Sequence, residues 1–216
     1  MSEPLALRPY QEAALTNLWD WFSAGKRDCL VVLPTGAGKS LVIAEWAKLV
    51  FDTDPSACIL VLTHVRELVQ QNAAELAGLW PEAPWGIYSA GLGRRDIGAQ
   101  LLFASIQSIH KKAYKLPRRV DMVLIDEAHD FEPQWLALAA KMVNPRTKAL
   151  MVVYDDIQAI YKGRGRPVWS QLGIEAKGRT TVLKVNYRNT VQILAFARHF
   201  ASDVIGSPGT TADDEH

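Results

Sequence analysis

Cysteine is scarce in this chain, which holds only Cys29 and Cys58 among its 216 residues. Each lies in an apolar run, DCLVVL or ACILVL, without a CxxC spacing or a neighbouring histidine. This pattern excludes a disulfide framework and a cysteine-type zinc site, because both need clustered thiols. We therefore expect two reduced thiols in the core of a cytoplasmic protein.

Long apolar runs and an excess of charge are also missing. No apolar stretch reaches the ~20 residues that a membrane-spanning helix needs. The start, MSEPLALRPYQ, lacks the cationic segment and apolar run of a signal peptide. The formal net charge is +1, so the average charge neither indicates nor excludes a nucleic-acid partner. We expect no membrane partner.

Short apolar runs alternate with amphipathic segments along most of the chain. The runs are continuously apolar, which predicts strands buried on both faces of a parallel sheet. Helical spacing follows most of them, so we predict one α/β domain over residues 1–205, a mostly parallel sheet flanked by helices. Residues 206–216 are polar and acidic and predict a disordered tail. The expected strands are residues 29–33, 57–62, 100–105, 121–126, 148–154 and 180–185.

The segment LPTGAGKS, residues 33–40, follows the first expected strand and opens a helix. Its two glycines allow the backbone to curl so that successive N–H groups point toward a phosphate. Lys39 can reach the outer phosphates of ATP, and the Ser40 hydroxyl can bind Mg²⁺. The strict pattern has a small residue where Leu33 stands, and the alternative is an ordinary glycine-rich turn. The expected cofactor-binding residues here are Pro34, Thr35, Gly36, Ala37, Gly38, Lys39 and Ser40.

Two adjacent carboxylates end the expected strand in LIDEAH, residues 124–129. We expect Asp126 to hold Mg²⁺ and Glu127 to orient and deprotonate the attacking water. The pair suits phosphoryl transfer because one carboxylate acts through the metal and the other acts on the nucleophile. Alone, the segment could be a solvated acidic turn, and the upstream phosphate loop is what favours catalysis by Lys39 and Glu127.

Six segments of the front part carry a family resemblance: LRPYQ (7–11), LPTGAGKS (33–40), VLTHVRELVQQN (61–72), YSAGLGRR (88–95), FASIQSI (103–109) and LIDEAH (124–129). Together they resemble the first RecA-like domain of superfamily 2 helicases, closest to RadD-like and restriction-subunit-like DNA helicases. The resemblance implies a P-loop NTPase fold and an ATP-dependent motor that acts on DNA rather than RNA, in repair or defence.

The same resemblance implies roles for single residues. Arg8 and Gln11 would contact adenine, and His129 would link hydrolysis to movement. Plain alternatives remain, namely packing of Tyr10 at a helix start and helix capping by the Ser and Thr side chains. The nucleic-acid backbone would meet two loops at the carboxyl ends of strands, through Thr63, His64, Arg66, Ser105 and Gln107.

From about residue 124 to 200 the segments resemble superfamily 1 helicases of the UvrD/Rep kind. They are DFEPQWLALAAKMV, VVYDDIQAIYKGRGR and GRTTVLKVNYRNTVQILAFA. The resemblance implies that Gln158 and Arg188 contact the terminal phosphate as catalytic residues, with Tyr161 on the nucleic-acid side. Superfamily 1 spells the acidic motif DExQ, so His129 departs from it. The alternatives are a polar residue at a helix start for Gln158 and a surface ion pair for Arg188.

A second motor domain is missing from the expected elements. Helicases place ATP between two RecA-like domains, and the second supplies an arginine that stabilises the transition state. After VNYRN, residues 185–189, one expected helix and the tail remain. We expect a single motor domain, incomplete as a helicase, that is weak or inactive until a second RecA-like domain joins it in cis or in trans. The alternative is a nucleotide-dependent nucleic-acid or partner-binding module without significant turnover.

Positive charge gathers in two places along the chain, within residues 157–200 and just before the Asp126 strand. Such clusters are either solvated faces or phosphate contacts. The second cluster is made of Lys111, Lys112, Lys115, Arg118 and Arg119.

Overall fold

The apolar runs form a single eight-stranded sheet. The computed structural model describes residues 6–33, 36–116, 120–155, 168–175 and 180–182. Across the sheet the order is β4-β3-β5-β2-β6-β7-β1-β8, and every pair is parallel except β3 with β4. The strands are β1 Cys29–Val32, β2 Ile59–Thr63, β3 Trp85–Ser89, β4 Arg94–Arg95, β5 Leu101–Ser105, β6 Met122–Ile125, β7 Ala149–Tyr154 and β8 Thr180–Val182.

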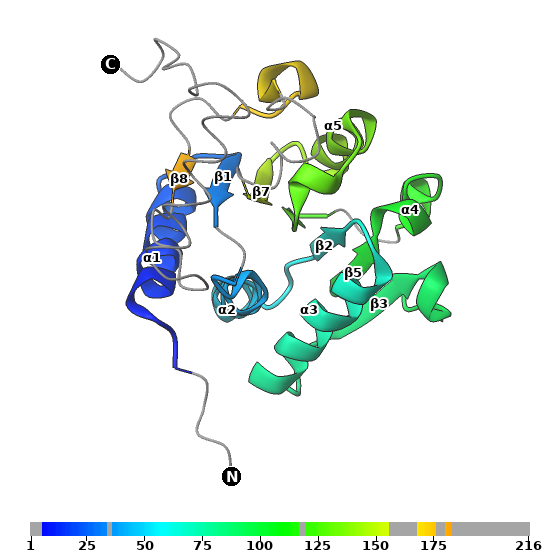
Figure 1. The fold of residues 1–216 in the computed structure, drawn as a ribbon, viewed down its shortest axis with the longest axis horizontal. Helices are drawn as coiled ribbons and strands as arrows, with labels where there is room; N and C mark the ends of the chain where they lie inside the picture. Colours follow the sequence, from blue (N-terminus) through cyan, green and yellow to red (C-terminus); the bar gives the residue numbers. More distant parts are fainter. Residues whose placement is uncertain (1–5, 34–35, 117–119, 156–167, 176–179, 183–216) are drawn as a thin grey trace, which may run out of the picture.

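Helices cover both faces of this sheet (Figure 1). The long helices α1 Pro9–Ser23, α2 Lys39–Thr53 and α3 Arg66–Leu79 lie on one face, where their apolar side chains form one core cluster. The helices α4 Ile106–Ile109 and α5 Pro133–Met142 lie on the other face and belong to a second cluster. Short 3₁₀ helices connect the rest: η1 Ala90–Leu92, η2 Ala113–Lys115, η3 Ala128–Asp130 and η4 Trp169–Leu172.

Each central strand supplies side chains to both core clusters. In β2, Ile59 and Val61 pack with α1, α2 and α3, whereas Leu60 and Leu62 pack on the opposite face. Successive side chains of a strand point to opposite faces, so a strand covered on both sides must be apolar throughout. This explains the continuous apolar runs of the sequence and confirms the expected parallel sheet.

The strands β3 and β4 are not among the expected elements. β3 reads WGIYS, and Gly86 interrupts its apolar pattern. A side chain there would clash, because an added Cβ would lie 2.7 Å from Asp96 Cβ and 2.8 Å from Ala99 Cβ. The glycine therefore lets the segment after β4 pack directly on β3.

None of the helices in the described ranges is long and apolar enough to cross a membrane.

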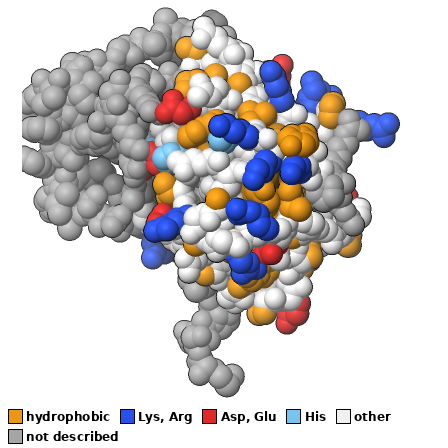
Figure 2. Space-filling view, turned by 90° about the vertical axis from the view of Figure 1, so that its right-hand side faces the viewer, with side chains coloured by type: hydrophobic (Ala, Val, Ile, Leu, Met, Phe, Trp, Pro, Cys, Tyr) orange, Lys and Arg blue, Asp and Glu red, His pale blue; other side chains and the backbone are white. Residues whose placement is uncertain are grey.

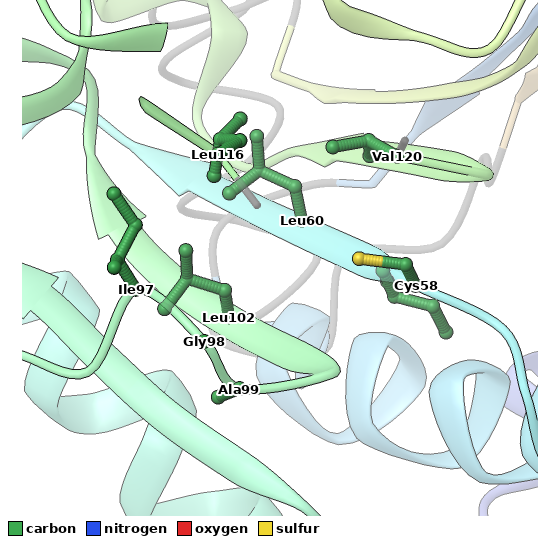
Figure 3. A pocket seen from close by; sticks show the side chains of 9 residues that line it. Cys58, Leu60, Ile97, Gly98, Ala99, Leu102, Leu116 and Val120 are labelled. Atoms are coloured by element: carbon green, nitrogen blue, oxygen red, sulfur yellow. The ribbon is translucent and has the colours of Figure 1, made fainter. Parts of the chain in front are cut away.

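A small cavity, shown in Figure 3, lies between β2, β5 and the segment after β4, with Leu60, Leu102 and Leu116 among its apolar walls. Its volume is ≈ 10 Å³, about the room of a single water molecule. We therefore interpret it as a packing gap.

Replacing Gly86 tests the close approach at β3. We expect Gly86→Ala to lower the free energy of unfolding by about 1–3 kcal/mol, because the new methyl group overpacks a closed site. Gly78→Ala in α3 is the matched control, since nothing lies within 4 Å of its added Cβ and helix propensity favours alanine by up to about 1 kcal/mol. Urea denaturation measures both variants, and equal stabilities would contradict the packing described.

Candidate functional site

The parallel strands end at the same edge of the sheet, and the predicted site residues that the structure describes lie at this edge or beside it. The loops that follow β1 and β6 carry the phosphate segment and the acidic pair, and β2 and β5 end in Thr63 and Ser105. Ligands of open parallel sheets bind outside these carboxyl ends. The topology therefore brings together residues that are far apart in the sequence (Figure 1).

The phosphate loop has the backbone conformation that its glycines predict. Gly36 and Gly38 have φ angles of +80° and +74°, in the left-handed region that glycine adopts without strain. Helix α2 begins directly afterwards with Lys39 and Ser40, both buried. The N-terminus of this helix carries a partial positive charge and free N–H groups that suit an anion. Pro34 and Thr35 lie outside the described residues.

An ion pair joins the phosphate loop to the acidic motif. Lys39 Nζ lies 3.0 Å from both carboxylate oxygens of Glu127. The side chains are 8% and 17% exposed, so the pair is partly shielded from water, where a charge contact is stronger than at the surface. Glu127 has a φ of +53°, a conformation that costs a residue with a side chain some strain. Lys39 is therefore held by a carboxylate of the acidic motif.

Asp126 is buried beside this pair and is only partly satisfied. Its side chain is 2% exposed, and Asn72 Nδ2 donates a 2.9 Å hydrogen bond to Oδ2. Oδ1 is buried and accepts no hydrogen bond from the residues that the structure describes. Burial, followed by the charge of Glu127, raises the pKa of Asp126 to about 6, although Asn72 and Lys39 oppose the shift. A cation would relieve this unfavourable charge.

The oxygen donors present fit Mg²⁺. That ion prefers one or two protein oxygen ligands and completes its shell with water and phosphate oxygens. The Asp126 carboxylate and the Ser40 hydroxyl are the donors of this kind that the motifs predict. Within the described ranges, no group of three or more His, Cys, Asp or Glu side chains could hold a metal ion. A metal site here would therefore need the ligand's own oxygens.

His129 touches the acidic motif from within the core. Its imidazole is fully buried, with Nε2 3.5 Å from Glu127 Oε2 and 3.7 Å from Asp130 Oδ1. The ring meets Tyr154 edge to face, with centroids 6.3 Å apart. His129 thus connects Glu127 with the end of β7. This geometry is compatible with the implied role in coupling, which stays a prediction.

The start of α1 braces the phosphate loop. Tyr10 OH and Gln11 Nε2 both donate to the carbonyl oxygen of Ala37, at 3.1 and 3.0 Å. Gln11 Oε1 accepts from the N–H of Arg8 at 2.9 Å, and the Gln11 side chain is 3% exposed. Both ends of the amide are thus bound within the chain. The structure shows the alternative role, Tyr10 packing at a helix start, and the adenine contacts stay a prediction.

The nucleic-acid candidates of two loops lie side by side. Thr63 and Ser105 are register partners on β2 and β5, and His64 Nε2 lies 3.3 Å from Gln107 Nε2. Ser105 caps α4, because its hydroxyl accepts from the N–H of Ser108. Thr63 caps no helix and donates instead to the carbonyl oxygen of Val65. Helix capping therefore explains Ser105 and leaves Thr63 to be explained otherwise.

Arg66 belongs to a basic surface at the outer edge of the sheet. Its guanidinium pairs with Glu67 at 2.7 Å and remains 60% exposed. Figure 2 shows Lys and Arg side chains spread over the side of the molecule that carries α4 and β3. Arg118 and Arg119 lie outside the described residues. The exposed basic residues of α3, β4 and the segment after α4 are Arg66, Arg94, Arg95, Lys111, Lys112 and Lys115.

Besides Pro34 and Thr35, three more predicted site residues are outside the part of the chain that the structure describes. Gln158, Tyr161 and Arg188 lie outside the described residues, so their roles stay predictions. Asn72, in contrast, is a site residue that the motifs do not identify. It occupies the buried stripe of α3 together with Val69, Ala73 and Leu76. A polar side chain in such a stripe needs a partner, and this was the signal that could have found it.

Comparisons with known proteins agree with this geometry. Residues 4–153 match the family model described as type III restriction enzyme, res subunit. The putative mitochondrial ATP-dependent helicase irc3 of Schizosaccharomyces pombe is 27% identical over 168 residues, which cover 75% of this chain and 27% of that protein. The chain therefore spans about a quarter of this curated relative.

Two solved structures show the same fold at low sequence identity. The UvsW helicase of bacteriophage T4 matches with a TM-score of 0.63 and 17% identity, over 83% of this chain and 61% of that one. The Sulfolobus solfataricus SWI2/SNF2 ATPase core in complex with dsDNA matches with a TM-score of 0.60 and 15% identity, over 79% and 38%. These matches confirm the RecA-like fold. The resemblance to superfamily 1 beyond residue 124 stays a prediction.

Neutralising Asp126 tests the electrostatics of the site. The folded-state pKa lies above the ordinary value, so the ionised carboxylate costs stability above about pH 6 and costs nothing below about pH 4. Without ATP and Mg²⁺, we expect Asp126→Asn to raise the free energy of unfolding at pH 7.5 by up to about 3 kcal/mol. The gain should vanish as the pH falls from 6 to 4.

Urea denaturation across this pH range measures the effect. Asp52→Asn is the control, since Asp52 is exposed on α2 and its substitution should leave the pH profile unchanged. A gain for Asp126→Asn that is equal at pH 4 and pH 7.5 would contradict the cause assigned to it.

Proposed function

The chain belongs to the family of type III restriction enzyme res subunits, and on that premise we propose that it is an ATP-hydrolysing motor domain that acts on DNA. The proposal rests above all on one observation, the contact of Lys39 with Glu127 beside a buried Asp126 with an unused oxygen. These are the charges that phosphoryl transfer needs in one place.

The proposed chemistry begins with an exchange of partners at Lys39. The outer phosphates of ATP take the ammonium group away from Glu127, which becomes free to act on water. Glu127 then orients the attacking water and accepts its proton. Ser40 and Asp126 would hold Mg²⁺, which when bound neutralises phosphate charge. The phosphate loop directs backbone N–H groups of Gly36, Ala37 and Gly38 toward the phosphates. Gln11 holds the loop in this conformation through its hydrogen bond to the carbonyl oxygen of Ala37.

The proposed DNA site is the polar edge next to the nucleotide. His64, Gln107 and Thr63 lie there beside each other at the ends of β2 and β5, and the exposed Arg66 extends the edge. One similar structure is described as an ATPase core in complex with dsDNA, which favours DNA over RNA. We propose backbone contacts from these loops, as the motifs imply.

The proposal includes a second RecA-like domain, in cis or in trans. Support comes from the relative described as a helicase, of which this chain spans 27%. A second candidate function is a nucleotide-dependent binding module with negligible turnover. In such a module ATP still takes Lys39 from Glu127, but turnover waits for the charge that a second RecA-like domain supplies.

Steady-state ATP hydrolysis, with and without single-stranded DNA, tests the proposal. We expect DNA-stimulated, Mg²⁺-dependent turnover that Lys39→Ala lowers by at least ~10²-fold, since it removes a charge that stabilises the transition state. Lys48→Ala in the same helix is the matched control and should retain full activity.

The other outcomes are equally informative. Absence of turnover together with Lys39-dependent binding of a fluorescent ATP analogue would support the binding module. Absence of both turnover and binding, or activity that survives Lys39→Ala, would contradict the proposed function.

A further inference from the structure

An apolar groove lies at the opposite edge of the sheet from the phosphate loop. It is bounded by the carboxyl-terminal ends of α1 and α2 and by the first residues of β6 and β7, Met122 and Ala149. Its volume is ≈ 450 Å³, in the range of small-ligand and anchor-residue pockets. No residue that we place in the candidate site lines it.

The wall of the groove is an aromatic surface. The rings of Phe22 and Trp46 pack with centroids 5.6 Å apart, and Trp46 Nε1 lies 3.1 Å from Met122 Sδ. Trp46 is buried, whereas Trp19 is 41% exposed, which is rare for a large apolar side chain in the described part of this chain. The polar atom of Trp46 is already in contact, so the wall offers a partner mainly apolar area.

Two guanidinium groups stand at the rim of this wall. The exposed side chains of Arg27 and Arg146 line the groove, and neither makes an ion pair or side-chain hydrogen bond with the described residues. Arg27 also lines an adjoining polar pocket of ≈ 290 Å³ together with Lys141 and Lys148. Asp28 and Glu175 line this pocket too, so its charge is mixed and positive charge is concentrated at the groove itself.

We propose that this groove binds an acidic peptide segment of a partner protein. One apolar or aromatic side chain of the segment lies against Trp19 and Phe22, and its flanking carboxylates pair with Arg27 and Arg146. Arginine suits this role because its planar fork binds a carboxylate through two parallel hydrogen bonds. An apolar anchor surrounded by a charged rim is the usual arrangement of a binding hot spot.

The groove fits a peptide better than a nucleic-acid strand. A strand presents a row of phosphates and needs a row of cations. The cations that line the groove are Arg27, Arg146 and Lys26, and the Lys26 ammonium group lies over the Trp21 ring. Asp54 also lines it, and hydrogen bonds from Ser56 hold the pKa of that carboxyl below its usual range. This negative charge opposes a continuous row of phosphates more than it opposes carboxylates that are spaced along a peptide and can lie over Arg27 and Arg146. A peptide also uses the apolar wall.

Fluorescence anisotropy with a labelled peptide, Glu-Asp-Leu-Phe-Asp-Glu, tests the proposal on the full chain. We expect saturable binding that weakens about tenfold in Arg27→Gln, in Arg146→Gln and in Trp19→Ala, because each loses one anchoring contact. Lys111→Gln and Tyr114→Ala are matched controls, since both are exposed residues of other elements. The uncharged peptide Gln-Asn-Leu-Phe-Asn-Gln should bind at least about tenfold more weakly.

Equal binding of the charged and uncharged peptides would overturn the proposal, as would unchanged binding by the Arg27→Gln/Arg146→Gln variant. Loss of duplex DNA binding by that variant, with peptide binding retained, would assign the edge to nucleic acid instead. Loss of self-association in sedimentation would assign it to a second copy of the chain. Melting temperatures confirm that the variants are folded. The inference does not rest on the proposed ATPase function, because ATP binding should be the same in every variant.

Discussion

The ion pair between Lys39 and Glu127 connects the two halves of the candidate site. Its contacts of 3.0 Å join the first turn of α2 to the loop after β6, across 88 positions of sequence. The pair holds Lys39 and the expected general base, Glu127, in one geometry. It sets one positive against one negative charge, so a ligand rich in negative charge competes with Glu127 for Lys39.

Other contacts hold the surroundings of this pair in place. Gln11 donates a hydrogen bond to the carbonyl oxygen of Ala37, and Asn72 donates one to Oδ2 of Asp126. These contacts leave one oxygen of Asp126, Oδ1, buried without a hydrogen bond from the described residues. Proteins tolerate such groups where a ligand completes them. The parallel sheet makes the arrangement possible because its strands end at the same edge.

Much of this site is predictable from sequence because its chemistry is local. LPTGAGKS and LIDEAH single out Lys39, Asp126 and Glu127, which the structure brings together, and continuous apolar runs predict the parallel sheet. Contacts between distant segments have no such local signal. The Gln11 brace on the phosphate loop, the Asn72 bond to Asp126 and the aromatic groove depend on how helices pack, and β3 is hidden by Gly86. Spacing rules describe one element at a time and therefore miss these features.

The most direct test of the central claim measures the affinity for a fluorescent ATP analogue in a double-mutant cycle. If Glu127 restrains Lys39, Glu127→Gln should tighten binding by about tenfold. The same substitution in a Lys39→Ala background should change the affinity little, because no ammonium group remains to be released. An equal gain in both backgrounds would show that Glu127 acts only by repelling the phosphates. It would contradict the claim that the ion pair must break before ATP binds.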